Sequence, residues 1–117
     1  MDPRSPLTTK DLEHEAPSAM DETLEGYAWL PRIIDKARAY DAGMLGSYVH
    51  PCPVDQRCLG LLGIEAADFR AIASSARTGA DVVAGLERAG ARSAEDAWFD
   101  APAFEEALMR GEFDHAG

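Results

Sequence analysis

The chain has 117 residues, of which 46% are hydrophobic and 27% are charged, a composition typical of one globular domain with a single modest core. Its formal net charge of −10 argues against nucleic acid and anionic membrane as partners, because both require a basic surface. The longest apolar run, CLGLLGI, is far shorter than the roughly 18 residues of a membrane span. The first residues contain no apolar stretch typical of a secretory signal, so we expect a cytoplasmic protein.

The charges are unevenly distributed along the chain. Residues 1–25 hold seven acids and two bases, residues 94–117 hold seven acids and one base, and residues 26–93 hold seven acids and eight bases. The two ends therefore carry −5 and −6, while the centre carries +1. Either this pattern directs an anionic ligand to the centre, or the acidic ends simply keep the protein soluble.

The organisation of the chain follows from its polar start and its glycine and proline residues. Residues 1–25 are polar and rich in Pro, Ser and Thr, which predicts an extended arm with a short turn near Met20–Leu24. From Gly26 onward, glycine and proline separate four to five short helical patterns. We therefore predict an all-α single domain over 1–117, with a helical core over 26–111 and a tail over 112–117.

The clearest helix is predicted from about Leu30 to Ala42. Pro31 suits the first turn of a helix, and Gly43 suits the left-handed position just past its end. At 100° per residue, one face gathers apolar side chains that we expect to be buried. These side chains are Leu30, Ile33, Ile34, Ala37 and Tyr40. The opposite arc holds Arg32, Asp35, Lys36 and Ala39.

The remaining elements are short. A glycine-flanked stretch over 47–50 is a candidate extended segment. A second helix is predicted over 53–63, between a proline and a glycine, and a third over 66–76. A fourth helix opens with the capping-box pattern of Thr and Asp at 78 and 81 and stops at the glycine at 90. The last helix is predicted over 102–111.

Residues 50–58, HPCPVDQRC, contain both cysteines of the chain. One H-x-C with a second cysteine six residues later matches no common zinc spacing, so we expect no metal. Six helical residues separate two Cα atoms by roughly 9 Å, beyond the roughly 7 Å that a disulfide tolerates. Cys58 lies on an apolar stripe and is expected to be a buried hydrophobe. Cys52 precedes the helix start, where it either lines a site or acts as a nucleophile.

Other polar residues have a structural interpretation, and some of them also have a functional one. Asp55 stands in the first helical turn, where a carboxylate accepts backbone N–H groups. His50 is either a surface or packing residue or a general base. Arg32 and Lys36 are like charges four residues apart, which is unfavourable on a bare helix. They either belong to a salt-bridge ladder through Asp35 or hold a carboxylate or phosphate of a substrate.

Residues 24–69, LEGYAWLPRIIDKARAYDAGMLGSYVHPCPVDQRCLGLLGIEAADF, resemble a bacterial family known as domain-of-unknown-function family 5069. The family pattern includes LPR, IDKARA, GEY and CPLD in this order. The resemblance implies a small, mostly helical bacterial domain, and it implies no established reaction. The polar pattern positions are Tyr27, Arg32, Asp35, Lys36, Arg38, Tyr48 and Asp55. A pattern that specifies so many polar side chains is more typical of a site than of a core.

Three departures from the family pattern indicate a divergent member. The PRSP segment of the family corresponds here to Pro17–Met20, which lacks the arginine and has Ser18 at its second position. The GEY motif is GSY, so Ser47 replaces a carboxylate. Asp41 stands where the family has an aliphatic residue. These changes imply either a changed or a lost activity.

Two hypotheses follow. In the first, the protein is a small enzyme or ligand-binding protein that acts without a cofactor on a small anionic metabolite, by elimination, isomerisation or cyclisation. Its expected acid/base residues are Asp35, His50 and Asp55. Its expected binding residues are Tyr27, Arg32, Lys36, Arg38, Tyr48 and Cys52. The sequence has no phosphate-cradling glycine loop or dinucleotide fingerprint, and a homodimer is left open.

In the second hypothesis, the protein is a non-catalytic interaction or regulatory module. Its acidic ends would bind a basic partner, and exposed aromatic side chains would anchor the contact. The candidate anchors are Trp29, Trp98 and Phe99.

Overall fold

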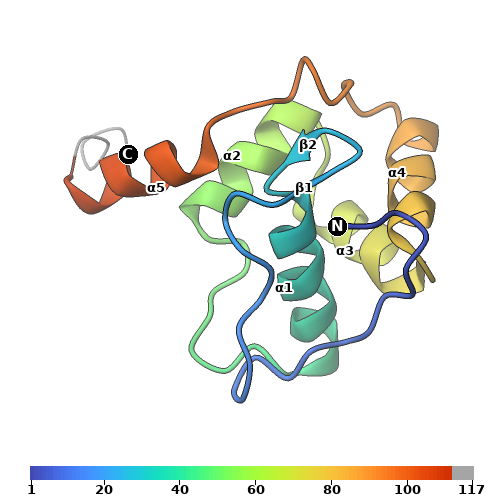
Figure 1. The fold of residues 1–117 in the computed structure, drawn as a ribbon, viewed down its shortest axis with the longest axis horizontal. Helices are drawn as coiled ribbons and strands as arrows, with labels where there is room; N and C mark the ends of the chain where they lie inside the picture. The colour runs from blue at the N-terminus through green and yellow to red at the C-terminus, as the bar shows by residue number, and fades with distance from the viewer. Residues whose placement is uncertain (112–117) are drawn as a thin grey trace.

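The computed structural model describes residues 1–111, which form five helices and a short hairpin (Figure 1). The elements in chain order are β1 (Thr23–Leu24), β2 (Tyr27–Ala28), α1 (Leu30–Ala42), α2 (Pro53–Leu62), α3 (Ala66–Ser75), α4 (Gly79–Arg88) and α5 (Ala101–Met109). The prediction of a small, largely helical protein is confirmed. The predicted tail over 112–117 lies outside the described residues.

Helix α1 lies at the centre of the molecule and packs most extensively on α3. Its bounds match the prediction, and Gly43 adopts the left-handed conformation with φ 71°. The apolar face is buried as expected, except for Tyr40, which is 45% exposed. The prediction for Tyr40 is wrong because its ring packs against polar groups at the end of the helix. The Arg70 guanidinium lies 4.4 Å from the ring centroid, and the edge of the His50 ring approaches it.

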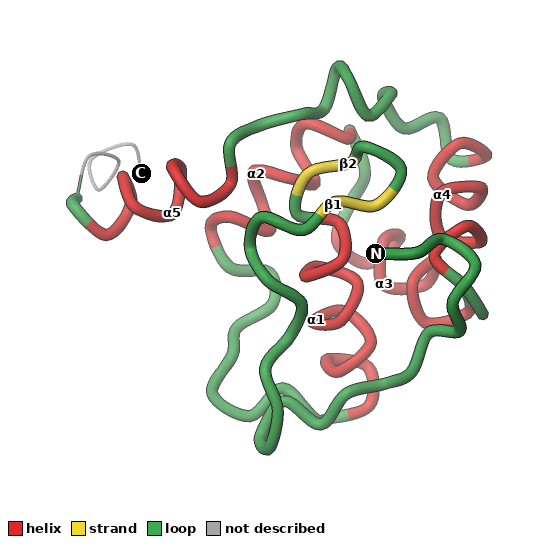
Figure 2. Tube along the Cα trace, in the orientation of Figure 1, coloured by secondary structure: helices red, strands yellow, loops and turns green. Residues whose placement is uncertain are grey.

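The opposite arc of α1 is buried as well. Asp35 and Lys36 are each 3% exposed, and Ala39 is fully buried. The N-terminal arm covers part of this side, and the long loop after α1 lies on the same side of the helix (Figure 2). Backbone hydrogen bonds fasten the arm at Leu7 N to Arg77 O and at Leu12 N to Met44 O. The arm therefore belongs to the packed structure.

The hairpin β1–β2 was not predicted. Thr23 pairs with Ala28 across a two-residue turn, in which Glu25 and Gly26 have φ values of 51° and 82°. Positive φ at both central residues is typical of the turns that match the twist of a hairpin. The hairpin buries Leu24 completely and leads the chain directly into α1.

The predicted extended stretch over 47–50 is wrong. These residues form a turn, with a hydrogen bond from Tyr48 N to Leu45 O, and they pair with no strand. Within 1–111, the one strand pair is β1–β2, so the stretch has no sheet edge beside it. Val49 is 62% exposed, which is consistent with a loop rather than a strand.

The other helices begin at the residues that the sequence marked. Cys52 caps α2 ahead of Pro53, and Thr78 forms the expected capping box with Asp81 at the start of α4. Helix α5 begins after Asp100 and extends away from the body beside α2 (Figure 1). None of the helices in the described part of the chain has the length and apolar character required to span a membrane.

Candidate functional site

The centre of the candidate site is Asp55, a carboxylate with no solvent exposure in the first turn of α2. Its Oδ1 accepts a hydrogen bond from the Trp29 indole at 2.7 Å. Its Oδ2 lies 2.8 Å from Lys36 Nζ and 3.0 Å from His50 Nδ1, and it accepts from the Cys52 backbone N at 3.1 Å. One side chain thus joins the start of α1, the loop after α1 and the start of α2.

The pKa of Asp55 reflects a balance of opposing effects. Burial by itself raises the pKa, but the hydrogen bond from His50, the charge and hydrogen bond of Lys36, and the hydrogen bond from Trp29 outweigh it. Together they lower the pKa of Asp55 to about 2. The carboxylate is therefore ionised at neutral pH, as a buried charge with a buried partner should be. This environment suits a fixed negative charge better than a group that exchanges protons.

His50 is buried behind the same carboxylate. Its side chain has no solvent exposure, and its Nδ1 faces a carboxylate that accepts only, so Nδ1 carries the proton. Its Nε2 is buried without a hydrogen-bond partner among the described residues. His50 therefore orients Asp55, and it does not line the cavity described below.

Lys36 and Cys52 contact each other beside Asp55. Lys36 Nζ lies 3.2 Å from Cys52 Sγ while it contacts Asp55 on its other side. Cys52 Sγ also accepts from the Asp55 backbone N at 3.4 Å, which completes the capping box of α2. The ammonium is thus held between a carboxylate and a thiol.

A cavity of about 380 Å³ opens in front of this pair. It is lined by Met20 of the arm, by residues of α1 and its N-terminal edge, by the loop and start of α2, and by α5. The lining side chains are Met20, Trp29, Arg32, Lys36, Ser47, Tyr48, Val49, Cys52, Pro53, Glu105, Leu108 and Met109. Arg32 and Lys36 give the cavity two cations, Glu105 gives it one carboxylate, and most of the other lining side chains are apolar.

Arg32 is the second cation of the cavity. Its guanidinium lies 5.4 Å from the Trp29 ring and 5.8 Å from the Tyr48 ring, and its Nη1 donates to Ser18 O at 3.1 Å. Its Nε is buried without a hydrogen-bond partner among the described residues. A buried donor without an acceptor is costly, so the Arg32 guanidinium is not fully satisfied by its contacts within the described part of the protein.

The structure brings four of the expected binding residues together and separates the others. Arg32, Lys36, Tyr48 and Cys52 line the cavity. Tyr27 lies elsewhere, with its hydroxyl donating to Arg92 O at 3.3 Å, and burial and then the charge of Glu87 raise its pKa. Arg38 donates to the carbonyl oxygens of Ala73 and Ala76 at the end of α3. Tyr27 and Arg38 therefore have structural contacts.

Asp35 also lies apart from the other expected acid/base residues. Its Oδ2 accepts from Ser18 N and Ser18 Oγ, each at 2.7 Å, and pairs with Lys10 Nζ at 2.9 Å. These contacts fasten the N-terminal arm to α1. The expected trio of acids and bases is therefore divided into a buried His50–Asp55 pair and a separate arm anchor at Asp35.

The three divergent positions have different surroundings. Ser18 supplies the contacts of the arm with Asp35. Ser47 lies at the cavity, where a carboxylate in its place would repel an anion. Asp41 is exposed, and it accepts from the Ser74 hydroxyl at 2.6 Å. Of these three changes, the one at Ser47 bears most directly on a ligand.

Two of the three aromatic anchors expected of an interaction module are buried. Trp29 is 2% exposed and Phe99 is 8% exposed, because both belong to the main hydrophobic core. Trp98 is 57% exposed. The expectation of an exposed aromatic cluster is therefore wrong for Trp29 and Phe99.

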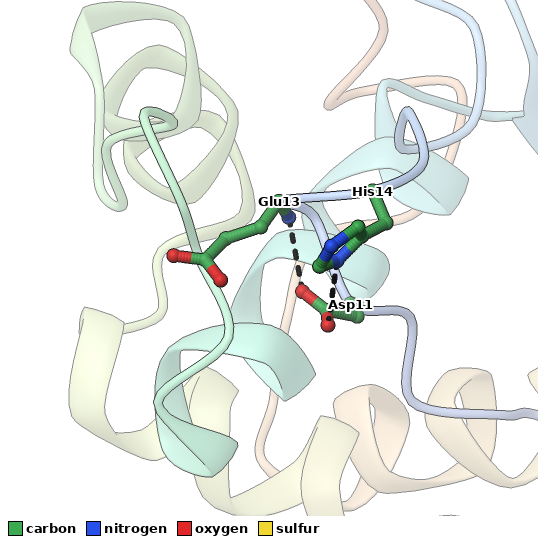
Figure 3. A group of neighbouring side chains, drawn as sticks. All are labelled: Asp11, Glu13 and His14. Carbon is green, nitrogen blue, oxygen red and sulfur yellow. Dashed lines mark hydrogen bonds and ion pairs between the residues drawn. The ribbon is translucent and has the colours of Figure 1, made fainter.

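Asp11, Glu13 and His14 form a second polar group, on the exposed side of the arm (Figure 3). The Asp11 carboxylate already accepts from the Glu13 backbone N and contacts His14 Nδ1, each at 3.0 Å (Figure 3). A carboxylate oxygen of Glu13 lies within 4.8 Å of both side chains. The bond from the Glu13 backbone and then that of His14 lower the pKa of Asp11. These local contacts explain the group as a turn, and it offers no enclosed ligand position.

Fold and site together define a small helical protein with a cavity that Arg32 and Lys36 line and that lies beside a buried ionic cluster. The sequence profile described as "Domain of unknown function (DUF5069)" matches residues 14–107. The chain belongs to this family. No curated protein matches the sequence.

Several residues of the site had no clear signal in the sequence. Trp29 was expected to be an exposed aromatic residue, whereas its indole donates a hydrogen bond to the buried Asp55 carboxylate. Glu105, Leu108 and Met109 lie about 50 residues beyond Cys52 in the chain and reach the cavity only because α5 packs beside α2.

Proposed function

We propose that the protein binds a small organic anion in the cavity between α1, α2 and α5. The observation that carries this proposal is that Arg32 and Lys36 both line a cavity whose other lining side chains are mostly apolar, with Glu105 as the one carboxylate among them. A carboxylate of the ligand would pair with the Arg32 guanidinium, because Lys36 is already paired with Asp55. An aromatic or aliphatic body would then contact Trp29 and the α5 side chains.

Acid/base chemistry on this anion is the second part of the proposal. The titratable side chains that line the cavity are Arg32, Lys36, Tyr48, Cys52 and Glu105, so they would touch the ligand. His50 and Asp55 would act as positioning residues, because the Asp55 carboxylate pairs with Lys36 and His50 is hydrogen-bonded to that carboxylate. We propose elimination, isomerisation or cyclisation as the reaction classes, since each needs proton transfer and no bound cofactor. The proposed setting is the bacterial cytoplasm, because both cysteines are free thiols, which persist in reducing compartments.

A binding experiment with benzoate tests the anion site. Benzoate and uncharged benzamide have the same aromatic body, so a cationic site should bind benzoate and discriminate against benzamide. Calorimetry on the wild type and on Arg32→Gln should give about tenfold or greater weakening of benzoate in the variant, because a charge-assisted hydrogen bond contributes roughly 1.5–3 kcal/mol.

Arg57→Gln is the matched control for this experiment. Arg57 lies on α2 with its guanidinium 5.7 Å from the Phe104 ring, and it does not line the cavity. Its variant should bind benzoate like the wild type. Equal binding of benzamide, or an unchanged affinity in Arg32→Gln, would contradict the proposal.

A further inference from the structure

We propose that Cys52 is a nucleophile, and that it forms covalent bonds with small electrophiles whose carboxylate is held beside it by Arg32 and Lys36. This inference rests on the proposed anion site and adds a reaction to it. It is carried by the position of the thiol in the cavity and by the two cations that share this cavity.

The surroundings of Cys52 Sγ are those of an electron-pair donor. Both of its contacts, the Lys36 ammonium at 3.2 Å and the Asp55 backbone N–H at 3.4 Å, use the sulfur as acceptor. The thiol lies at the start of α2, where N–H groups face outward from the helix. Cys52 is partly exposed and lines the cavity, so a ligand can approach it.

The Lys36 ammonium is held rigidly in place. It is 3% exposed and lies 2.8 Å from Asp55 Oδ2, and Asp55 is itself held by Trp29 and His50. A positive group with a fixed position loses little entropy when a ligand binds. Lys36 therefore serves as a positioning residue for both the sulfur and an arriving anion.

Arg32 supplies the contact that selects a carboxylate. Its Nη1 is occupied by Ser18 O, and its side chain lines the same cavity as Cys52. A carboxylate paired with the Arg32 guanidinium would therefore lie in the cavity that Cys52 lines. The selection therefore depends on Arg32 and the reaction on Cys52, so the two functions can be separated by mutation.

Cys58 provides an internal comparison. It is 3% exposed in the core, with its thiol directed at Ala28 O at 3.9 Å. Burial, and then the charge of Asp55, raise its pKa to about 12. Cys58 should therefore remain unmodified in the folded protein.

With an acyl substrate, the covalent step is a substitution at the carbonyl carbon. Cys52 Sγ forms a bond to the carbonyl carbon, and the bond from that carbon to the leaving oxygen or sulfur breaks. The leaving group departs with the electron pair and takes up the proton that the thiol gave. For the probe iodoacetate, Sγ bonds to the methylene carbon, iodide leaves, and the thiol proton passes to the buffer.

The test compares alkylation of the full chain by iodoacetate and by iodoacetamide, followed by mass spectrometry. Both reagents react with the same sulfur, so the ratio of their rates cancels the intrinsic reactivity of the thiol and reports recruitment of the carboxylate. We expect the ratio in the folded wild type to exceed that of the urea-unfolded chain by about tenfold, from one charge-assisted contact. Peptide mapping should place the modification on Cys52 and leave Cys58 free.

Four variants sharpen the test. Arg32→Gln should lower the ratio to that of the unfolded chain, Arg32→Lys should restore part of it, and Arg57→Gln should leave it unchanged. Cys52→Ser should abolish modification of the folded protein. A ratio that is the same in the wild type, Arg32→Gln and the unfolded chain, or modification of Cys58 at the same rate as Cys52, would overturn the proposal.

Benzoate separates this inference from the proposed anion site. If benzoate binds and slows carboxymethylation of Cys52, both proposals are supported. If benzoate binds in an Arg32-dependent manner while Cys52 shows no preference for iodoacetate, the nucleophile is wrong and the anion site stands. Loss of both benzoate binding and iodoacetate preference would overturn both.

Discussion

At the scale of single residues, Asp55 is the side chain on which the site depends most. It satisfies the buried ammonium of Lys36, the indole of Trp29 and the ring of His50, and it also caps α2. A buried charge with so many partners is stable only while all of them are present, because removal of one leaves another unpaired. Asp55 therefore couples the stability of the protein to the geometry of its cavity.

Asp55→Asn should lower the free energy of unfolding by about 3 kcal/mol at pH 7, because the Lys36 ammonium is left without a counter-ion. The wild type should also lose stability with acid in a defined range. Since folding lowers the pKa of Asp55 from 3.8 to about 2, its contribution is complete above about pH 4 and is lost as the pH falls through 2. This loss amounts to roughly 2–3 kcal/mol and should be missing in the variant. Urea unfolding at several pH values measures both effects.

Asp81→Asn is the matched control for this prediction. Asp81 has the same place in the capping box of α4, but it is exposed, and its carboxylate accepts from the backbone N–H groups of Arg77 and Thr78. Its loss should cost about 1 kcal/mol, the usual worth of a helix cap. An equal cost at the two positions would contradict the importance of the buried ionic cluster.

At the scale of elements, the helix ends carried most of the information in the sequence. Pro31 and Gly43 defined α1, and the capping box defined α4, because these residues act on the backbone next to them. The hairpin before α1 was missed because its strands have two residues each and its Glu25–Gly26 turn lacks the usual Asn-Gly signature. Tertiary packing then decides what the helix faces contact.

The two interior helical glycines, Gly60 and Gly85, should respond oppositely to alanine. At Gly60, in α2, an added Cβ meets nothing within 4 Å, so Gly60→Ala should stabilise the protein by about 0.5–1 kcal/mol through helix propensity. At Gly85, in α4, a Cβ would lie 2.7 Å from Ile72 Cγ2 of α3. Gly85→Ala should therefore cost about 1 kcal/mol net, since overpacking of 1–3 kcal/mol exceeds the gain in propensity. Thermal or urea unfolding measures both, and stabilisation by Gly85→Ala would show that α3 and α4 can separate freely.

At the scale of the whole molecule, the N-terminal arm closes the side of α1 that no helix covers. The contacts of Asp35 with Ser18 and Lys10 span 17 and 25 residues in the chain. Such pairings leave no local pattern, which is why the sequence did not show that the arm covers the charged arc of α1. The same limit applies to the cavity, because the arm and α5 contribute Met20 and Met109 from opposite ends of the described chain. Sequence spacing placed Arg32 and Lys36 on one arc, but only the fold places them beside Cys52.

Asp35→Asn should loosen this arm. The variant retains one acceptor but loses the charge that holds Lys10 and strengthens the bonds from Ser18, so we expect a loss of about 2 kcal/mol. Thermolysin should also cleave within residues 5–20 faster than in the wild type, as mass spectrometry of the fragments would show. Asp41→Asn, which changes an exposed carboxylate on the same helix, should leave the arm protected. Arm cleavage at the wild-type rate in Asp35→Asn would mean that the backbone contacts of the arm suffice.

The burial of Trp29 has an optical consequence. One indole of the chain forms a wall of the cavity, beside the Arg32 guanidinium, while the other, Trp98, is 57% exposed. In a Trp98→Phe variant, fluorescence would come from Trp29 alone. Its emission wavelength and its quenching by added iodide would then report directly whether the cavity is filled, without a label and at micromolar protein concentrations.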